Sequence, residues 1–161
     1  MGLKILKKQD GIFKNLLNCV RKKAMRIKLD AGAKMPTKAH LTDAGFDIYA
    51  REKQIVPAKE FAVFDTGVHI ELPPNTVGML KSKSGLNVKH GIVSEGVIDV
   101  GYTGSIKVKL YNHSGYDYTV EAGDKITQLV ILPLAAVSPM VLVDELEETD
   151  RGNNGFGSSG K

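Results

Sequence analysis

The sequence predicts an all-β domain, a sandwich, jelly roll or barrel, from three observations. Apolar and polar residues alternate over short stretches, which is the period of half-buried strands. Turn formers separate these stretches, and no long amphipathic helix interrupts them. The turn formers are Pro57, Pro73-Pro74-Asn75, Ser84-Gly85, Gly101, Gly104, Gly115 and Gly123-Asp124.

Three stretches show the alternation most clearly. They lie at 25–29, 68–72 and 106–110, where every second residue is Met, Ile, Leu or Val and the residues between are charged or His. Such a pattern buries one face of a strand and leaves the other in water. We therefore expect a β-domain over residues 25–150.

The segment before this domain, residues 1–24, has a different period. Phe13, Leu16, Leu17 and Val20 follow the spacing of one helical face and are surrounded by Lys and Arg. A basic amphipathic helix of this kind can bind a membrane surface or a protein partner. The alternative is a peripheral or poorly ordered extension, because short isolated helices are marginal in water.

Composition limits the class of protein. The chain has 161 residues, 25% of them charged and 42% hydrophobic, and a net charge of +4, which attracts nucleotides without requiring a nucleic-acid partner. Cys19 is the only cysteine, so no intrachain disulfide can form. No apolar run reaches the roughly 18 residues of a membrane span, and no persuasive signal peptide is present. We expect a soluble cytoplasmic protein.

Four segments of the β-domain combine glycine with groups that can do chemistry. Residues 42–48 (TDAGFDI) carry two carboxylates, 81–86 (KSKSGL) carry cations and hydroxyls at a glycine turn, 96–104 (GVIDVGYTG) place an acid at a hairpin, and 123–129 (GDKITQL) place an amide on a buried strand. Each also has a structural explanation: an Asx turn, a solvated loop, a turn-capping Asp and a satisfied backbone group. The last residues, 151–161 (RGNNGFGSSGK), cannot pack a core and read alone as a flexible tail.

In this order and spacing, the four segments and the tail resemble the five signature motifs of the trimeric dUTPase family. The resemblance runs from about Met25 to Lys161 and is most specific in the third motif and the tail. It implies a β jelly roll that forms a homotrimer with a swapped, flexible C-terminal tail, each active site drawing motifs from three subunits. The implied activity is hydrolysis of dUTP to dUMP and pyrophosphate with Mg²⁺.

The resemblance also assigns roles at the nucleoside end of the substrate. Asp99 is similar to the family's catalytic carboxylate, which deprotonates the attacking water and contacts the sugar 3′-hydroxyl. Tyr102 would lie against the deoxyribose and exclude a 2′-hydroxyl. The backbone of the same hairpin, including Gly96, Val97 and Ile98, would read the uracil edge.

Further roles concern the phosphates and the metal. Asp47 would organise Mg²⁺ indirectly, through its water shell, since Mg²⁺ dehydrates reluctantly. The implied phosphate and lid residues are Lys83, Ser84, Gly85, Gln128, Arg151, Phe156 (stacked on uracil), Gly157, Ser158 and Ser159. Two positions depart from the family pattern: Lys83 stands where Arg is usual, offering a point charge instead of a bidentate fork, and Gly101 stands where an acid is frequent.

Two other functions remain open. A dCTP deaminase shares the fold and parts of the central motifs, but would release ammonia from dCTP and leave the triphosphate intact. A nucleotide-gated regulatory protein could use the same fold, with the N-terminal extension as its partner-binding element. Assays of the products separate the first of these from dUTP hydrolysis.

Overall fold

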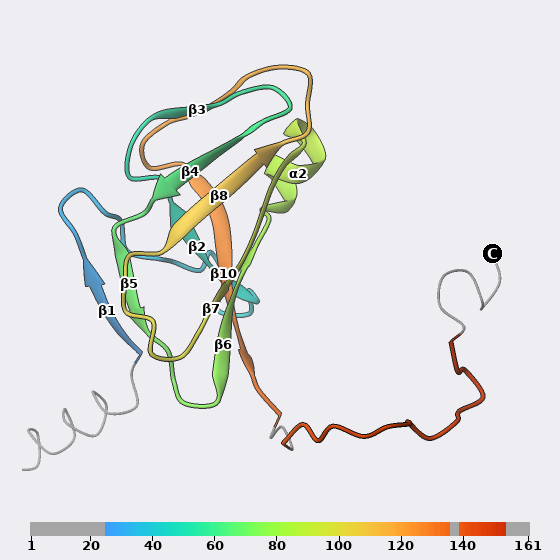
Figure 1. The fold of residues 1–161 in the computed structure, drawn as a ribbon. Coiled ribbons are helices and arrows are strands. Elements are labelled where there is room, and N and C mark those ends of the chain that lie inside the picture. The colour runs from blue at the N-terminus through green and yellow to red at the C-terminus, as the bar shows by residue number, and fades with distance from the viewer. Residues whose placement is uncertain (1–24, 136–138, 154–161) are drawn as a thin grey trace, which may run out of the picture.

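The computed structural model describes residues 25–135 and 139–153, which form ten strands and one short helix (Figure 1). The predicted N-terminal helix and the tail residues from position 154 onward lie outside this range. The elements are β1 (Arg26–Leu29), β2 (Gly45–Tyr49), β3 (Gln54–Val56), β4 (Phe61–Asp65), β5 (Val68–Glu71), β6 (Thr76–Lys81), α2 (Ser84–His90), β7 (Ile92–Ile98), β8 (Lys107–Asn112), β9 (Tyr118–Val120) and β10 (Lys125–Pro133).

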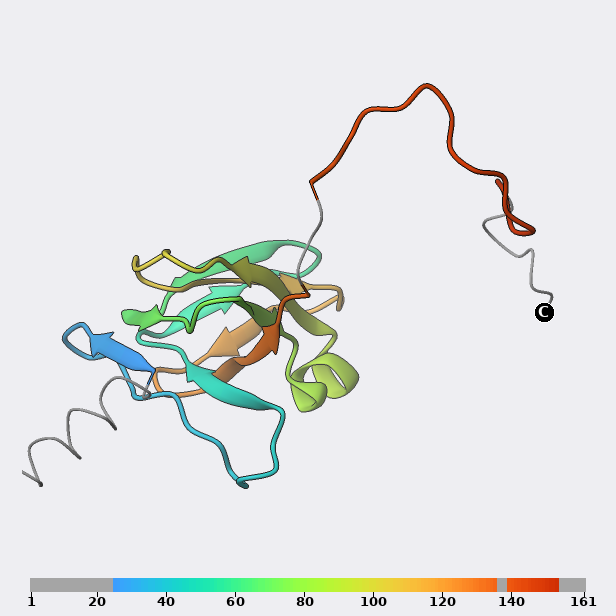
Figure 2. The same cartoon turned by 90° about the horizontal axis from the view of Figure 1, so that it is seen from below.

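The strands form one curled sheet and two small ribbons. The sheet has six strands in the order β2-β10-β6-β7-β8-β4, and the ribbons pair β1 with β5 and β3 with β9. All of these pairings are antiparallel. The predicted all-β class is confirmed, and the long sheet is strongly curled (Figures 1 and 2).

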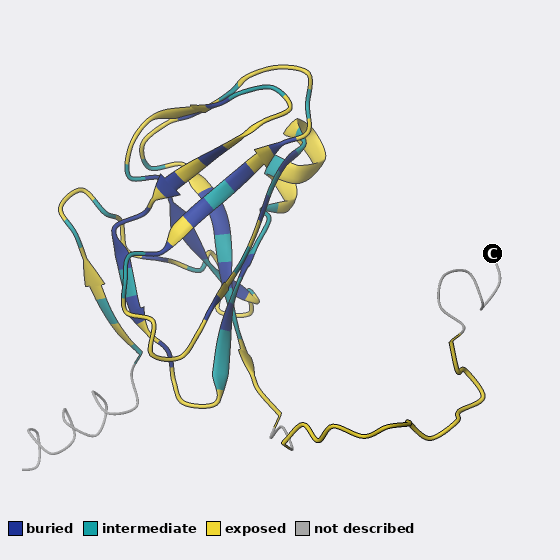
Figure 3. Cartoon of the chain, in the orientation of Figure 1, coloured by how far each residue is buried: buried dark blue, intermediate teal, exposed yellow. Residues whose placement is uncertain are grey.

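The core lies where the alternating patterns predict it. On β8, Val108 and Leu110 are completely buried while Lys107 faces solvent. Each such aliphatic side chain contributes about 1.5–3 kcal/mol when fully buried. Figure 3 shows the same alternation of buried and exposed residues on the neighbouring strands. Strand β1 is the exception: Ile27 packs against the core but Leu29 is exposed, because β1 pairs only with β5 at the margin of the domain.

One predicted turn is wrong. Ser84 and Gly85, expected to form a glycine turn, are the first residues of α2. The helix begins after Lys83, whose backbone is extended. It ends at Gly91, whose φ of 66° is the left-handed conformation of a helix C-cap. A Cβ at Gly85 would meet no atom within 4 Å, so no close packing requires glycine at this position.

The segment after β10 leaves the domain. The last strand ends at Pro133, although the predicted β-domain runs to residue 150, and residues 139–153 extend away from the sheets in both ribbon views (Figures 1 and 2). Met140, Val141, Leu142 and Leu146 are 78–100% exposed there. Within the described ranges, no helix is both long and apolar enough to cross a membrane.

Candidate active site

Three of the motif segments lie side by side on the long sheet. Gln128 on β10 pairs with Asp47 on β2 and, on its other side, with Lys81 at the end of β6. Gly45 permits the close approach of β2, since a Cβ there would lie 3.0 Å from the Leu129 carbonyl oxygen. The first, second and fourth motif segments therefore form one contiguous group.

Asp47 is the centre of this group. The residue is buried, and its Oδ1 accepts a hydrogen bond from Lys83 Nζ at 2.5 Å while Oδ2 lies 2.7 Å from Lys125 Nζ. Burial alone would raise the pKa of Asp47, but the hydrogen bonds from Lys125 and Lys83 outweigh it and the pKa lies below its usual value. The carboxylate is thus ionised at neutral pH and links β2 to β10 and to the residue before α2.

Hydroxyl groups fix the segment between β6 and α2. Ser94 on β7 donates its backbone N–H to Ser82 Oγ at 2.9 Å, and Ser82 Oγ donates to the Ser94 carbonyl at 3.1 Å. Beneath them, Ser94 Oγ lies 2.8 Å from Thr127 Oγ1, which donates to the Lys81 carbonyl at 3.0 Å. Gln128 Nε2 lies 3.5 Å from the Ser82 carbonyl oxygen. Ser82, two residues before Ser84, is thereby tied to β7 and β10.

The third motif segment forms the β7–β8 hairpin, as predicted. Tyr102 donates its N–H to the Asp99 carbonyl at 3.1 Å and its hydroxyl to the Ser105 carbonyl at 2.9 Å. Gly101 has a φ of 93°, which explains why glycine suits this position in this chain. A cavity of about 240 Å³ opens here, lined by Val97, Ile98, Asp99, Tyr102 and Lys107.

The two groups of residues lie at opposite ends of β7. Ser94 bonds to Ser82, and Asp99 follows Ser94 by five positions, so Asp99 lies about 17 Å from the Ser82 segment at the usual rise of a strand. One copy of the domain therefore brings Asp47, Lys83, Ser84, Gly85 and Gln128 together. It places the Asp99 hairpin elsewhere.

Comparison with known proteins gives the family of the chain. The model of the dUTPase family matches residues 31–160, which is most of the chain. The chain belongs to the dUTPase family. Among its relatives, the deoxyuridine 5'-triphosphate nucleotidohydrolase of Kluyveromyces lactis is 41% identical over 140 residues, covering 86% of this chain and 95% of the relative.

Solved dUTPase structures share the fold. The Staphylococcus bacteriophage 80alpha dUTPase with dUPNHPP superposes with a TM-score of 0.76 at 33% identity, over 86% of this chain and 99% of the phage chain. The dUTPase variant from phage phi11 of S. aureus, described for its structural Mg(II) ion, superposes at 0.70 with 29% identity, over 78% of this chain and 99% of that one. The predicted family and jelly-roll-like fold are confirmed.

The described residues of this dUTPase-family site suit an indirect contact with Mg²⁺, through water. The described residues contain no group of three His, Cys, Asp or Glu side chains that could enclose a metal. Asp47 offers a single carboxylate, whose oxygens can accept further hydrogen bonds from water beside those from Lys83 and Lys125. Mg²⁺ usually keeps several waters and is bound through one or two carboxylates plus substrate phosphates. Asp47 fits that indirect contact.

Some contacts in this dUTPase domain were not predicted from the sequence. Lys125 was not assigned a role, although it lies in the fourth motif segment and donates to Asp47. The Ser94–Thr127 pair carried no sequence signal, because isolated hydroxyl residues on strands are common. Arg151 is described and exposed, whereas Phe156, Gly157, Ser158 and Ser159 lie outside the described residues, so their predicted roles stay predictions.

Proposed function

We propose that this chain hydrolyses dUTP to dUMP and pyrophosphate. The observation that carries the proposal is the hairpin cavity, which Val97, Ile98, Asp99 and Tyr102 line together in a member of the dUTPase family. These are the residues expected to contact the base, the sugar and the attacking water. The names of the relatives support dUTP as the substrate.

Asp99 supplies the base in this proposal. Its exposed carboxylate accepts a proton from a water molecule while the water oxygen forms a bond to the α-phosphorus. The bond from that phosphorus to the bridging oxygen breaks, and its electrons leave with pyrophosphate. General-base help of this kind typically accelerates a reaction by about 10²–10⁴-fold.

The Tyr102 ring supplies sugar selection. Its hydroxyl is held by the Ser105 carbonyl, so the ring has a defined position in the cavity wall. Ring atoms pressed against C2′ of a deoxyribose leave no space for a 2′-hydroxyl.

The phosphates lie against the Asp47 group. Lys83, Ser84, Gly85 and Gln128 provide positive charge, a hydroxyl and N–H groups, and Asp47 would hold a Mg²⁺ ion indirectly, through water. When bound, Mg²⁺ neutralises charge that develops on the phosphate oxygens. Lys83 acts as a point charge held by Asp47, since lysine lacks the planar fork of arginine.

The site is completed by neighbouring copies in a homotrimer. The separation between the Ser82 segment and Asp99 supports this, because one nucleotide must meet both groups. The exposed apolar residues at 140–143 and 146 also support it, since such residues are stabilised when another surface covers them. We propose that this segment crosses to a neighbour, and that Arg151, Phe156, Gly157, Ser158 and Ser159 close over the nucleotide as a lid.

Pyrophosphate release from dUTP, dTTP, dCTP and UTP, with and without Mg²⁺, tests the proposed function. We expect Mg²⁺-dependent release that is strongest with dUTP. Ammonia from dCTP with the triphosphate intact would instead establish a deaminase. Nucleotide binding without turnover would favour the regulatory role.

A further inference from the structure

His69 on β5 joins two segments that no strand pairing connects. Its Nε2 lies 3.1 Å from Asp30 Oδ2, in the turn that follows β1, and its Nδ1 lies 2.8 Å from the Thr103 carbonyl oxygen in the β7–β8 hairpin. The side chain is mostly buried, with 18% of it exposed. The imidazole is therefore a bridge to the hairpin that contains Asp99 and Tyr102.

Both partners of the ring are acceptors. A carboxylate and a backbone carbonyl have no proton to donate, so each contact requires an N–H from the imidazole. A neutral imidazole has one N–H, whereas the imidazolium has two. Only protonated His69 satisfies both contacts.

Two cations besides the His69 ring lie near the Asp30 carboxylate, and the nearby acids have partners of their own. Lys28 Nζ on β1 lies 3.4 Å from Asp30 Oδ1, and Arg51 Nη1 lies 3.8 Å from Asp30 Oδ2. Glu71, the acid on β5 itself, pairs with Arg26. At the base of the hairpin Lys107 pairs with Asp65. Asp30 is thus the carboxylate in direct contact with the ring.

We infer that protonated His69 is a positioning residue, which holds the Thr103 side of the hairpin in place for nucleotide binding, and that nucleotide affinity falls when His69 loses its proton. This inference rests on the proposed function. The Thr103 carbonyl follows Tyr102 directly, so a hairpin released at this carbonyl loosens the wall of the cavity.

The pH range follows from the contacts. The hydrogen bond to the Thr103 carbonyl, and then that to Asp30, raise the pKa of His69 above its ordinary value of 6.5. The bridge is complete below that ordinary value and is lost as the pH rises through the raised pKa. By linkage, nucleotide binding should raise the pKa further, because affinity and protonation change each other by the same factor.

The test compares the wild type with His69→Gln and with His113→Gln as a control, since His113 lies beyond the far end of β8. The pH dependence of KM for dUTP is measured between about pH 6 and 9, and the His69 ring signals are titrated by NMR with and without a non-hydrolysable imido analogue of dUTP. As the pH rises over this range, we expect KM of the wild type and of the control to increase about threefold to tenfold more than KM of His69→Gln. A change of this size corresponds to a nucleotide-induced shift of roughly half to one unit in the pKa of His69. The value of kcat should change little.

Asp30→Asn provides a second variant that keeps the ring. It should lower the pKa of His69 and move the rise in KM to lower pH. The inference is overturned if dUTP is hydrolysed but His69→Gln keeps the wild-type dependence of KM on pH, or if the analogue leaves the pKa of His69 unchanged. Absence of dUTP hydrolysis by the wild type at every pH would instead overturn the proposed function.

Discussion

The carboxylates of Asp47 and Asp99 have opposite surroundings, which suits them to different roles. Asp47 is buried and each of its oxygens accepts a hydrogen bond from a lysine, so it is held as an anion. Asp99 is exposed and lines the hairpin cavity. A general base must reach a water molecule and accept its proton. Asp99 meets that requirement, whereas both oxygens of Asp47 are already bound to lysines.

Asp99→Asn should reduce kcat by about 10²-fold or more, because the amide keeps the shape of the side chain but cannot accept a proton. Nucleotide binding should persist. The measurements are pyrophosphate release and titration with the imido analogue, with Asp117→Asn in the β8–β9 turn as the matched control. Near-normal turnover by Asp99→Asn would show that another group is the base.

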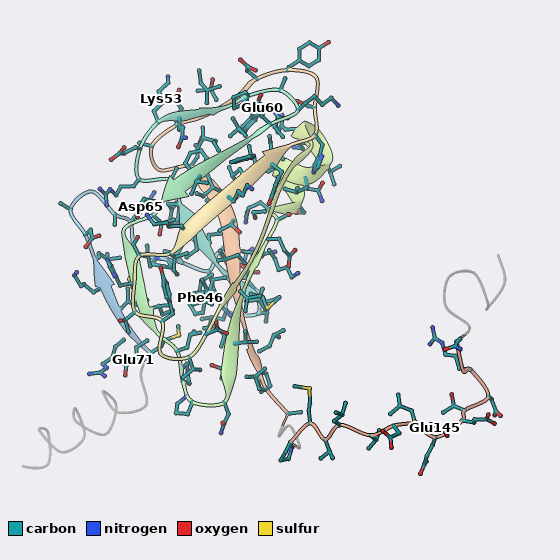
Figure 4. The ribbon with its side chains drawn as sticks, viewed as in Figure 1. Phe46, Lys53, Glu60, Asp65, Glu71 and Glu145 are labelled. Carbon is teal, nitrogen blue, oxygen red and sulfur yellow. The ribbon has the colours of Figure 1, made fainter. Side chains whose placement is uncertain are left out.

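At the scale of elements, the β7–β8 hairpin is held from several sides. Asp65, at the end of β4 (Figure 4), accepts hydrogen bonds from Ser105 Oγ and from the Gly67 N–H, and Lys107 Nζ lies 3.1 Å from its other oxygen. The Tyr102 ring lies over Gly104, where a Cβ would be 2.6 Å from the tyrosine hydroxyl. The loop geometry therefore depends on contacts made by neighbouring strands.

Gly104→Ala should displace the Tyr102 ring and weaken discrimination against UTP. The added methyl group leaves too little room for the ring, and the expected change is about tenfold in the ratio of kcat/KM for dUTP over UTP. Gly115→Ala is the matched control, since a Cβ there meets no atom within 4 Å. Tyr102→Ala should relax the ratio as well. Sugar selection lies elsewhere if neither variant at the hairpin changes it.

Asp65 should stabilise the domain in a manner that disappears in acid. The hydrogen bonds from Ser105 and Gly67, with a smaller effect of Lys107, lower the pKa of Asp65 to about 2. Because the folded pKa is depressed, this stabilisation is complete above the ordinary value of 3.8 and is lost as the pH falls through about 2.

Thermal unfolding of the wild type and Asp65→Asn between about pH 7 and 2 checks this. The Tm of the wild type should exceed that of the variant by a few degrees at neutral pH, with the difference vanishing at the acid end. Ser105→Ala should lose part of the same acid-dependent difference, since the hydrogen bond from Ser105 is the largest cause of the lowered pKa of Asp65. A difference between wild type and Asp65→Asn that is independent of pH would contradict the assignment.

At the scale of the whole molecule, the open question is how distant motifs meet one nucleotide. The group of Asp47, Lys83 and Gln128 lies near one end of β7, and Asp99 follows the other end. In a trimer with cyclic symmetry, a neighbour can present its hairpin to the Asp47 group. The proposed site is then shared between copies.

Mixing two inactive variants tests the shared site. We expect an equal mixture of Asp99→Asn chains and Lys83→Met/Ser84→Ala chains, unfolded and refolded together, to recover roughly a quarter of wild-type activity, since one site in three of every mixed trimer is intact. Each variant refolded alone is the control. If the mixture stays as inactive as its components while gel filtration shows mixed trimers, both groups act within one copy.

The sequence alone determined the fold class and the family. Alternation at 68–72 and 106–110 predicts which side of a strand is buried, because successive side chains of a strand point to opposite faces. The motif segments name the family, which the comparisons confirm. The roles of Asp99, Tyr102 and Phe156 stay predictions.

The tertiary structure decided which side chains touch. Asp47 meets Lys83 and Lys125, and His69 meets Thr103, across separations in sequence that strand order and register close. Alternation does not encode register between distant strands. Likewise, Gly85 reads as a turn residue, but the hydroxyl contacts of Ser82 and the left-handed Gly91 delimit a helix around it. Local pattern determines most of the strands, whereas long-range contacts determine where this helix forms and which chemical groups come together.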